Sequence, residues 1–338
     1  MTPRAAIVGI EGHALAGHER ALFARRPPLG FILFARNISE PEGVAALVAS
    51  LRDAVGRSHA PVLIDQEGGR VVRLGPPHWR RAPAAAELAA VPDAARAVEL
   101  NSRLIAEELH ALGIDVDCLP VLDLAIAGAH RIIGSRAYGA DPDRVANLGG
   151  AACAGLLAGG VLPVIKHIPG HGRARADSHQ ALPVVDTDRH TLAASDFVPF
   201  AQLADMPIAM TAHIVYAAID PDLPATLSPA VIAGVIRGEI GFQGFLVSDD
   251  LAMGALSGTP ALRTAAALAA GCDAVLMCSG KAGDNAAVLE AATPLEGAAD
   301  ARWQAARARL RAREAFDAAR AAGELASLLA PVSPRPDG

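Results

Sequence analysis

Residues 164–183 read VIKHIPGHGRARADSHQALP, and this stretch joins the end of an expected strand to a cluster of titratable side chains. The apolar run 161–165 at its start is typical of a short buried strand. The glycine-rich part that follows carries five titratable side chains of interest, which are Lys166, His167, His171, Asp177 and His179. A buried strand that ends in such a loop is a usual layout of an α/β active site.

An apolar run, a polar end and an alanine-rich helix pattern recur together along the 338 residues. The expected strands are 6–10, 30–34, 61–64, 113–119, 161–165, 208–211, 244–247 and 274–277. The expected helices between them include 41–55, 93–112, 141–159, 228–240 and 260–270. Two of these helices begin with a capping residue followed by proline, Asp141-Pro142 and Ser228-Pro229. Alternating strands and helices predict a parallel sheet, and eight such units predict a single (β/α)8 TIM-type barrel.

We expect one catalytic domain over residues 1–330. Residues 301–329 have the pattern of one long helix that packs outside the barrel, and the proline-rich tail 331–338 is expected to be flexible. The net charge of −6 and the absence of a long basic run disfavour nucleic acid and anionic membranes as partners. The four cysteines are scattered, and no run approaches the roughly 18 apolar residues of a membrane span. A soluble cytoplasmic protein is expected.

Polar side chains follow nearly every expected strand. In a barrel these strand ends meet at one rim, whereas a doubly wound sheet concentrates its groups at one switch point. No GxGxxG or GxxxxGK[ST] motif follows the early strands, which disfavours nucleotide binding. His213 follows the sixth strand, where it can line the pocket or simply cap the rim.

The strand GFLVS ends in two adjacent carboxylates, Asp249 and Asp250. Neighbouring side chains on extended backbone point to opposite sides, so one can face a pocket while the other binds backbone nearby. The plain alternative is that both acids cap the next helix. The polar groups at the other strand ends favour a functional role for Asp249.

Within residues 164–183, Asp177 and His179 are spaced to form a dyad in which the carboxylate orients the imidazole. Histidine and aspartate also bind metals, so a metal site is the alternative. Their spacing matches no compact pair of metal ligands, and Lys166 would repel a cation. We therefore expect neither a metal nor another cofactor. His171 also fits the role of a hydrogen-bonded loop histidine.

The segment DQEGGRVVR follows the third strand and offers Asp65 and Arg73. A carboxylate accepts hydrogen bonds from two vicinal hydroxyl groups at once, while the alternative is an ordinary turn with Arg–Glu pairs. Arg136 adds a planar set of donors on a later loop. Lys166 and His167 suit a neutral polar ligand. Aromatic residues are only 4% of the chain, so a small pocket is expected rather than a long groove of stacked sugars.

Five segments together resemble the single-domain β-N-acetylhexosaminidases of glycoside hydrolase family 3, which are cytoplasmic enzymes of peptidoglycan recycling. These segments are GFILFARN, DQEGGRVVR, KHIPGHGRARADSH, MTAHIVY and GFQGFLVSDDLAMGA. The resemblance covers most of the chain and implies a (β/α)8 barrel. Relatives commonly carry Phe where this chain has Ile168, a difference that affects none of the expected roles.

The resemblance implies a role for each matching residue. Asp249 is the expected nucleophile, and His179 with Asp177 is the expected acid/base pair on a mobile loop. The N-acetylglucosamine unit is expected to bind the side chains of Asp65, Arg73, Arg136, Lys166 and His167. The implied reaction proceeds with retention through a covalent glycosyl-enzyme. The implied substrate is a muropeptide fragment of the GlcNAc-anhydroMurNAc type, and a monomer is expected.

Other functions are compatible with parts of the pattern. A metal-dependent barrel hydrolase would use His167, His171, His179 and Asp249. A β-glucosidase would keep the chemistry and change the sugar, and a sugar-binding barrel would have lost its catalytic groups. Phosphorolysis, in which phosphate replaces water in the second step, is a further possibility for the same site.

Overall fold

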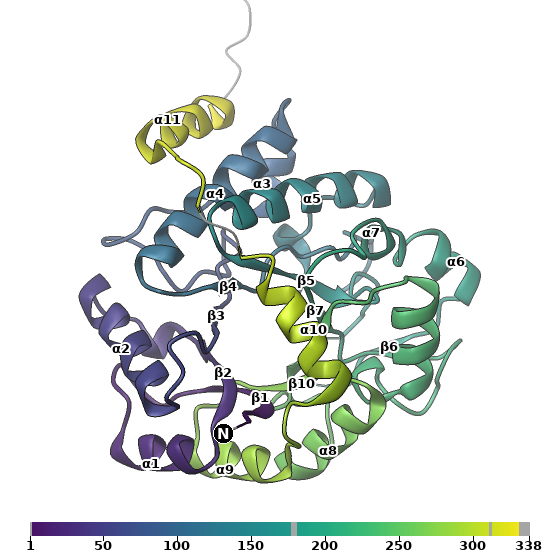
Figure 1. Ribbon diagram of the computed structural model, residues 1–338. Helices are drawn as coiled ribbons and strands as arrows, with labels where there is room; N and C mark the ends of the chain where they lie inside the picture. Colours follow the sequence, from purple (N-terminus) through teal and green to yellow (C-terminus); the bar gives the residue numbers. More distant parts are fainter. Residues whose placement is uncertain (1, 177–180, 311–312, 331–338) are drawn as a thin grey trace, which may run out of the picture.

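The computed structural model describes residues 2–176, 181–310 and 313–330, and its centre is a closed barrel of eight parallel strands (Figure 1). Around the barrel the strands follow the order β1-β10-β9-β7-β5-β4-β3-β2. Their bounds are Arg4–Gly9 (β1), Pro28–Leu33 (β2), Val62–Ile64 (β3), Val116–Asp117 (β4), Leu162–Ile168 (β5), Ile208–Thr211 (β7), Phe245–Asp250 (β9) and Ala274–Met277 (β10). The predicted (β/α)8 barrel is confirmed.

Each predicted strand overlaps one strand of the barrel, and two strands continue further at their carboxyl ends than predicted. β5 continues to Ile168 and β9 continues to Asp250. Their polar residues are therefore part of the strands, where hydrogen bonds to neighbouring strands fix the backbone. Two more short strands, β6 (Val184–Val185) and β8 (Val215–Tyr216), pair outside the barrel.

Helices surround the barrel on its outer face. They are α1 (Gly17–Arg25), α2 (Pro41–Ala54), α3 (Ala85–Ala89), α4 (Ala94–Ala111), α5 (Pro142–Ala158), α6 (Arg189–Ala194), α7 (Val198–Gln202), α8 (Pro260–Ala270) and α9 (Ala282–Ala291). Ala230–Glu239 (η4) forms a π-helix, and short 3₁₀ turns lie at Ala35–Asn37 (η1), Gly134–Arg136 (η2) and Ala225–Leu227 (η3).

Both predicted helix starts use their capping residues. The Asp141 carboxylate accepts the backbone N–H of Arg144, and the Ser228 hydroxyl accepts that of Val231. Each side chain satisfies one of the N–H groups that a helix start leaves without a partner.

The predicted long helix over 301–329 is wrong, because the chain forms α10 (Gly297–Arg307) and α11 (Ala318–Leu329), and the described residues between them, 308–310 and 313–317, are not helical. Arg103 of α4 gives the reason. Its guanidinium donates to the carbonyl of Glu314 and lies over the ring of Phe316, 4.5 Å from the centroid. These contacts outweigh the local helix propensity of the segment.

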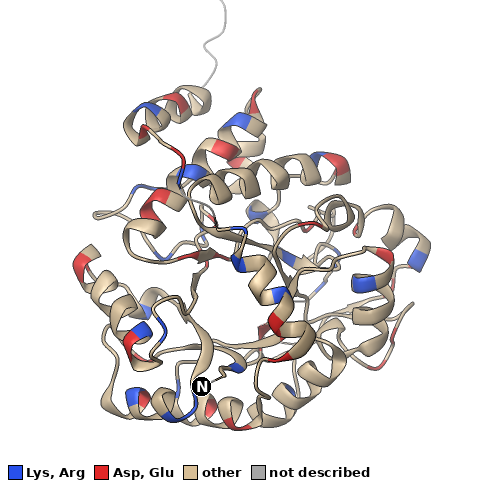
Figure 2. Cartoon of the chain, in the orientation of Figure 1, with Lys and Arg blue, Asp and Glu red and all other residues tan. Residues whose placement is uncertain are grey.

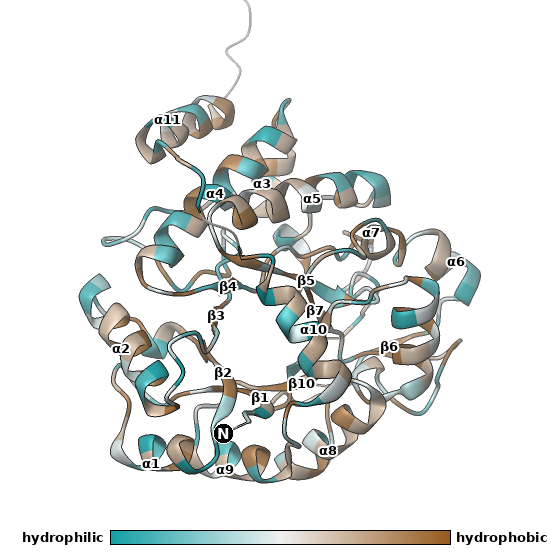
Figure 3. Cartoon of the chain, viewed as in Figure 1, coloured by the Kyte–Doolittle hydropathy of each residue, from teal (hydrophilic) through white to brown (hydrophobic). Residues whose placement is uncertain are grey.

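Apolar side chains fill two layers. One layer lies between the sheet and the helices, and the other fills the barrel itself. At the amino end of the barrel, Trp303 of α10 packs edge-to-face on Phe245, with ring centroids 5.3 Å apart. Most charged residues lie on the surrounding helices and loops (Figure 2), while the strand ribbons are mostly hydrophobic (Figure 3). Among the described residues, no helix is both long and apolar enough to cross a membrane.

Candidate active site

A cavity of about 260 Å³ opens at the carboxyl ends of the strands. Six of the predicted site residues line it, namely Asp65, Arg73, Arg136, Lys166, His167 and Asp249. They come from β5, β9 and the segments that follow β3 and β4, so the barrel gathers residues that are far apart in the sequence. Apolar side chains complete the lining, and they include Phe34, Val71, Ile132, Met210, Met253 and Leu276. Asp177 and His179 lie outside the described residues.

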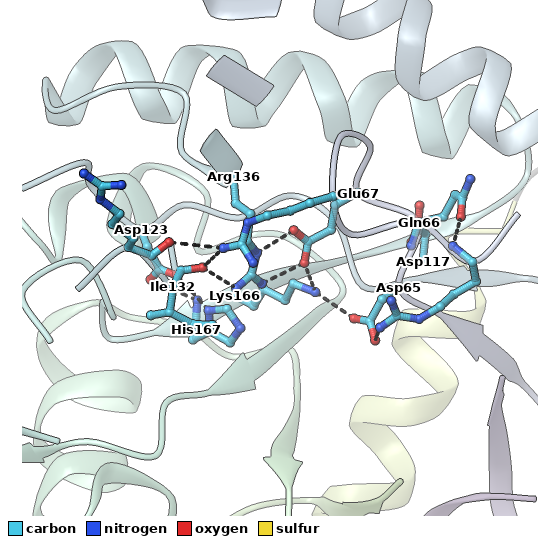
Figure 4. Close-up of polar contacts among 12 residues, drawn as sticks. Asp65, Gln66, Glu67, Asp117, Asp123, Ile132, Arg136, Lys166 and His167 are labelled. Carbon is cyan, nitrogen blue, oxygen red and sulfur yellow. Dashed lines mark hydrogen bonds and ion pairs between the residues drawn. The ribbon is translucent and has the colours of Figure 1, made fainter. Parts of the chain in front are cut away.

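The polar wall of the cavity is built around the ammonium group of Lys166 (Figure 4). Lys166 Nζ lies 2.8 Å from Asp65 Oδ1 and 2.6 Å from Glu67 Oε1, and its side chain is only 2% exposed. Arg73 Nη2 reaches the other oxygen of Asp65 at 3.2 Å. Arg136 donates two hydrogen bonds to the Glu67 carboxylate, from Nε at 2.7 Å and from Nη2 at 2.8 Å. We call Asp65, Glu67, Arg73, Arg136 and Lys166 the charged wall.

All members of the charged wall can be ionised together because their charges compensate. Burial opposes the charge on Lys166, but Asp65 and Glu67 outweigh it and hold the pKa of the ammonium above its ordinary value. Burial likewise opposes ionisation of the two carboxyls, yet the neighbouring cations hold the pKa of Asp65 and Glu67 below the ordinary values. The wall thus offers fixed charged donors and acceptors to a ligand.

Glu67 was not among the predicted site residues. The plain alternative to a binding role was an Arg–Glu pair within the turn after β3, whereas the structure pairs Glu67 with Arg136 of a later loop, inside the cavity. A signal was present, since Glu67 stands two residues after Asp65 and alternate residues of extended backbone share a face.

Asp123 is a second residue that the predicted site lacked. Its buried carboxylate accepts from His167 Nδ1 at 2.6 Å, from the backbone N–H of His167 at 3.2 Å and from that of His171 at 2.6 Å. Burial disfavours its charge, but the two histidines hold the pKa of Asp123 below its ordinary value. An ionised Asp123 fixes the proton of His167 on Nδ1, so Nε2 is the ring nitrogen available to the cavity.

Burial also lowers the pKa of His171 to about 4. Neutral His171 packs edge-to-face against His167, with ring centroids 5.5 Å apart. Within the described part of the chain, no three His, Cys, Asp or Glu side chains are arranged to hold a metal ion.

The two adjacent carboxylates at the end of β9 have different environments. Asp249 lines the cavity, and although burial opposes its charge, His213, His167 and Lys166 hold the pKa of Asp249 below its ordinary value. The Asp250 carboxylate accepts the backbone N–H groups of Ala252 and Cys278, both at 2.9 Å, and burial raises its pKa. Asp249 therefore presents an ionised carboxylate to the cavity, while Asp250 ties β9 to the end of β10.

Comparison with known proteins assigns the chain to one family. Residues 16–311 match the model of the glycosyl hydrolase family 3 N-terminal domain. The chain belongs to glycosyl hydrolase family 3. As a member of this family it is a glycoside hydrolase, and its curated relatives place it among the β-N-acetylhexosaminidases.

Two curated family 3 relatives carry the name beta-hexosaminidase. The protein from Alkalilimnicola ehrlichii is 43% identical over 282 residues, which cover 81% of this chain and 80% of the relative. The protein from Pseudomonas aeruginosa is 40% identical over 279 residues, which cover 82% of each chain.

Solved family 3 structures agree with this assignment. NagZ from Neisseria gonorrhoeae superposes with a TM-score of 0.85 at 30% identity, covering 98% of this chain and 99% of that one. A complex of the same protein with N-trifluoroacetyl-D-glucosamine gives the same values. A β-N-acetylglucosaminidase from Paenibacillus superposes with a TM-score of 0.81 at 33% identity over 96% of this chain, which spans 60% of that longer protein.

Proposed function

We propose that the chain is a retaining β-N-acetylglucosaminidase that removes terminal N-acetylglucosamine from peptidoglycan fragments. One observation carries this proposal: the ionised Asp249 shares a small cavity with the charged wall. The volume of about 260 Å³ lies below the range of roughly 300–1,000 Å³ typical of pockets for drug-sized ligands, which fits a single sugar unit.

The charged wall suits the hydroxyl groups of a sugar. Asp65 and Glu67 accept hydrogen bonds from hydroxyl groups, and Lys166, Arg73 and Arg136 donate to hydroxyl oxygens. Because these side chains are already paired, they are held in place before the sugar arrives. Because the side chains of the charged wall are already ordered, they lose less conformational entropy when the sugar binds.

In the proposed mechanism, Asp249 attacks the anomeric carbon and forms an ester bond to it as the bond to the leaving oxygen breaks. His179, paired with Asp177, gives its proton to that oxygen. Water then loses a proton to His179 and attacks the same carbon, which releases Asp249 as a carboxylate. Two displacements at one carbon give net retention. The imidazole is cationic before it gives up this proton and neutral afterwards, so neither form repels an anionic leaving group, as a second carboxylate would.

Two features support the proposed substrate class. Met253 and Leu276 give the cavity apolar surface that suits the methyl group of an acetamido substituent. Arg70 lines the cavity, is exposed, and donates to the carbonyls of Arg131 and Ile132. A guanidinium at this position suits a leaving group that carries a carboxylate, as the GlcNAc-anhydroMurNAc type does. The single domain over 1–330, the cytoplasmic location and the monomer stay predictions.

Two substrates and two variants test this function. We expect turnover of an aryl β-N-acetylglucosaminide, much slower turnover of the aryl β-glucoside, and full activity in chelator. Asp249→Asn should abolish turnover, and a 5-fluoro glycosyl fluoride should leave its sugar attached to Asp249, as read by peptide mass spectrometry. A label on another residue, or full activity of Asp249→Asn, would refute the nucleophile.

A second experiment tests the acid/base residue. His179→Ala should slow substrates with poor leaving groups far more than activated aryl glycosides, because the latter need little protonation. Equal losses on both substrate types would remove His179 from this role. Added phosphate separates hydrolysis from phosphorolysis, since only the latter yields a sugar 1-phosphate.

A further inference from the structure

We propose that His213, Thr226 and Thr211 form a hydrogen-bond chain that positions Asp249 for its attack, and this inference rests on the proposed function. None of the three side chains lines the cavity, and all are fully buried behind the end of β9. Thr211 ends β7, His213 follows it, and Thr226 comes from η3. We call these three residues the Thr–Thr–His chain.

The contacts of the Thr–Thr–His chain run from one side of Asp249 to the other. The backbone N–H of Asp249 donates to Thr211 Oγ1 at 3.4 Å. Thr226 Oγ1 lies 2.7 Å from Thr211 Oγ1 and 2.7 Å from His213 Nδ1. His213 Nε2 lies 3.0 Å from the carbonyl oxygen of Asp250. The chain therefore links the N–H of the nucleophile to the carbonyl of the next residue.

The direction of each hydrogen bond follows from the groups at the two ends. The carbonyl of Asp250 only accepts, so His213 Nε2 must carry a proton. A neutral imidazole that donates from Nε2 carries no proton on Nδ1, so Nδ1 can only accept, and burial, which lowers the pKa of His213, favours this neutral form. Thr226 Oγ1 also lies 3.1 Å from the carbonyl oxygen of Ala212, but its one hydrogen goes to Nδ1 at the shorter distance of 2.7 Å, and Thr211 donates to Thr226. The backbone N–H of Asp249 can only donate, which matches the remaining acceptor on Thr211.

This arrangement fixes the carboxylate as well as the backbone. Asp249 Oδ1 accepts the N–H of Asp250 at 2.8 Å, so the carboxylate is held by the same residue whose carbonyl His213 holds. On the opposite side, Cys278 N–H binds the Asp250 carboxylate. A shift of the Asp250 peptide would turn the attacking oxygen away from the sugar. Misplacement of a reacting group by about 1 Å can cost about a hundred-fold in rate.

His213 is thus a positioning residue that acts through Asp250, and Thr226 sets its tautomer. The charged wall, which is proposed to bind the sugar, comes from the segments after β3 and β4 and from β5, on other strands of the barrel. Loss of the Thr–Thr–His chain should therefore slow formation of the glycosyl-enzyme without weakening the binding of a free sugar.

Threonine-to-valine substitution tests this separation, because valine keeps the shape and removes the hydroxyl. For Thr226→Val we expect kcat for an activated aryl β-N-acetylglucosaminide to fall between about ten-fold and about a hundred-fold. The inhibition constant of free N-acetylglucosamine should change less than about two-fold. Thr226→Ser, which restores the hydroxyl, should recover most of kcat.

The matched control is Thr264→Val, since Thr264 is also fully buried but bonds the Pro260 carbonyl within α8. It should keep both kcat and the inhibition constant. If Thr226→Val does not fold, Thr211→Val and His213→Gln carry the test. Gln places a donor near the ε position, so His213→Gln should be faster than His213→Phe. Wild-type kcat in Thr226→Val, or equal losses of kcat and sugar binding, would overturn the proposal.

The trapping experiment keeps the two proposals apart. In the wild type, a label on a residue other than Asp249 would refute the proposed nucleophile. With Asp249 labelled in the wild type, Thr226→Val should take up the same label on the same residue at a lower rate. An unchanged labelling rate would refute the positioning role alone.

Discussion

At the scale of single residues, Lys166 shows how the site keeps a charge away from water. Burial of an ammonium group is costly unless anions compensate it, and here Asp65 and Glu67 both lie within 2.8 Å of Nζ. A buried pair of this kind is weak evidence for stability, but removal of one partner leaves an uncompensated charge. The charged wall is therefore best tested by neutralising one member.

Glu67→Gln removes the carboxylate that Lys166 and Arg136 share. We expect the free energy of unfolding to fall by about 3–5 kcal/mol and kcat/KM to fall with it, as measured by urea denaturation and steady-state kinetics. The matched control is Asp53→Asn, which breaks an exposed pair with Arg20 and should cost less than about 1 kcal/mol. Similar costs for both variants would contradict the account of the wall.

The same carboxylate predicts a dependence of stability on pH. The pKa of Glu67 is lowered in the folded state, so its contribution is present above its unfolded pKa and lost as the pH falls through the folded pKa. The pKa of Lys166 is raised, so its contribution holds below its ordinary value of about 10.4 and is lost at higher pH. The stability difference between wild type and Glu67→Gln should shrink by about 1.4 kcal/mol per pH unit below about pH 4. Urea titrations at several pH values measure it, and a constant difference would count against it.

Residue by residue, the sequence located the cavity lining well where a polar side chain lies among the last residues of a strand. Lys166 and Asp249 are of this kind. Asp123 lies several residues after β4, where no periodicity tells which way a side chain points. His213 could not be placed either, since its partners Thr226 and Asp250 are brought to it only by the folded barrel.

At the scale of elements, one buried glutamine holds the segment 65–74 after β3. Gln66 Oε1 accepts the N–H groups of Arg73 and Leu74, and its Nε2 donates to the carbonyl of Leu74. Its own N–H binds the buried carboxylate of Asp117. The side chain thus closes the segment so that Asp65 and Arg73, from its two ends, meet in the charged wall.

Gln66→Ala should open this segment. Each buried group left without a partner costs about 1–3 kcal/mol, so we expect a clear loss of stability and faster hydrogen exchange at Arg73 and Leu74. kcat/KM should fall because Arg73 is no longer fixed. Gln202→Ala, which removes an exposed glutamine bonded to Asp143, should change neither quantity. Unchanged exchange at residues 73 and 74 in Gln66→Ala would show that backbone contacts alone hold the segment.

The elements also show where local patterns stop being informative. All eight strands were predictable because buried parallel strands are short, apolar and separated by helices. The C-terminal region was not, because the pattern of residues 301–329 contains no signal for the contacts that Arg103 makes with Glu314 and Phe316. Tertiary contacts there cause the break between α10 and α11, which helix propensity alone does not predict.

At the scale of the whole molecule, α10 crosses the amino end of the barrel and Trp303 packs against its interior (Figure 1). Catalysis is proposed for the opposite end. Trp303→Ala should therefore lower the free energy of unfolding by about 3–5 kcal/mol while kcat/KM of the folded enzyme stays within about two-fold. Calorimetry and kinetics on the same preparation measure both. A large loss of kcat/KM with little loss of stability would show that the two ends of the barrel are coupled.

The packed interior of the barrel determines how a glycan enters the site and how the cleaved sugar leaves it. The apolar layer inside the barrel also forms the bottom of the cavity, through Met210, Leu276 and Cys278. The pocket is therefore closed at its inner end by packed side chains. A glycan can insert only its tip, and the cleaved unit must back out through the entrance by which it came. The enzyme would thus remove one terminal unit from a long chain and dissociate from it after each cleavage.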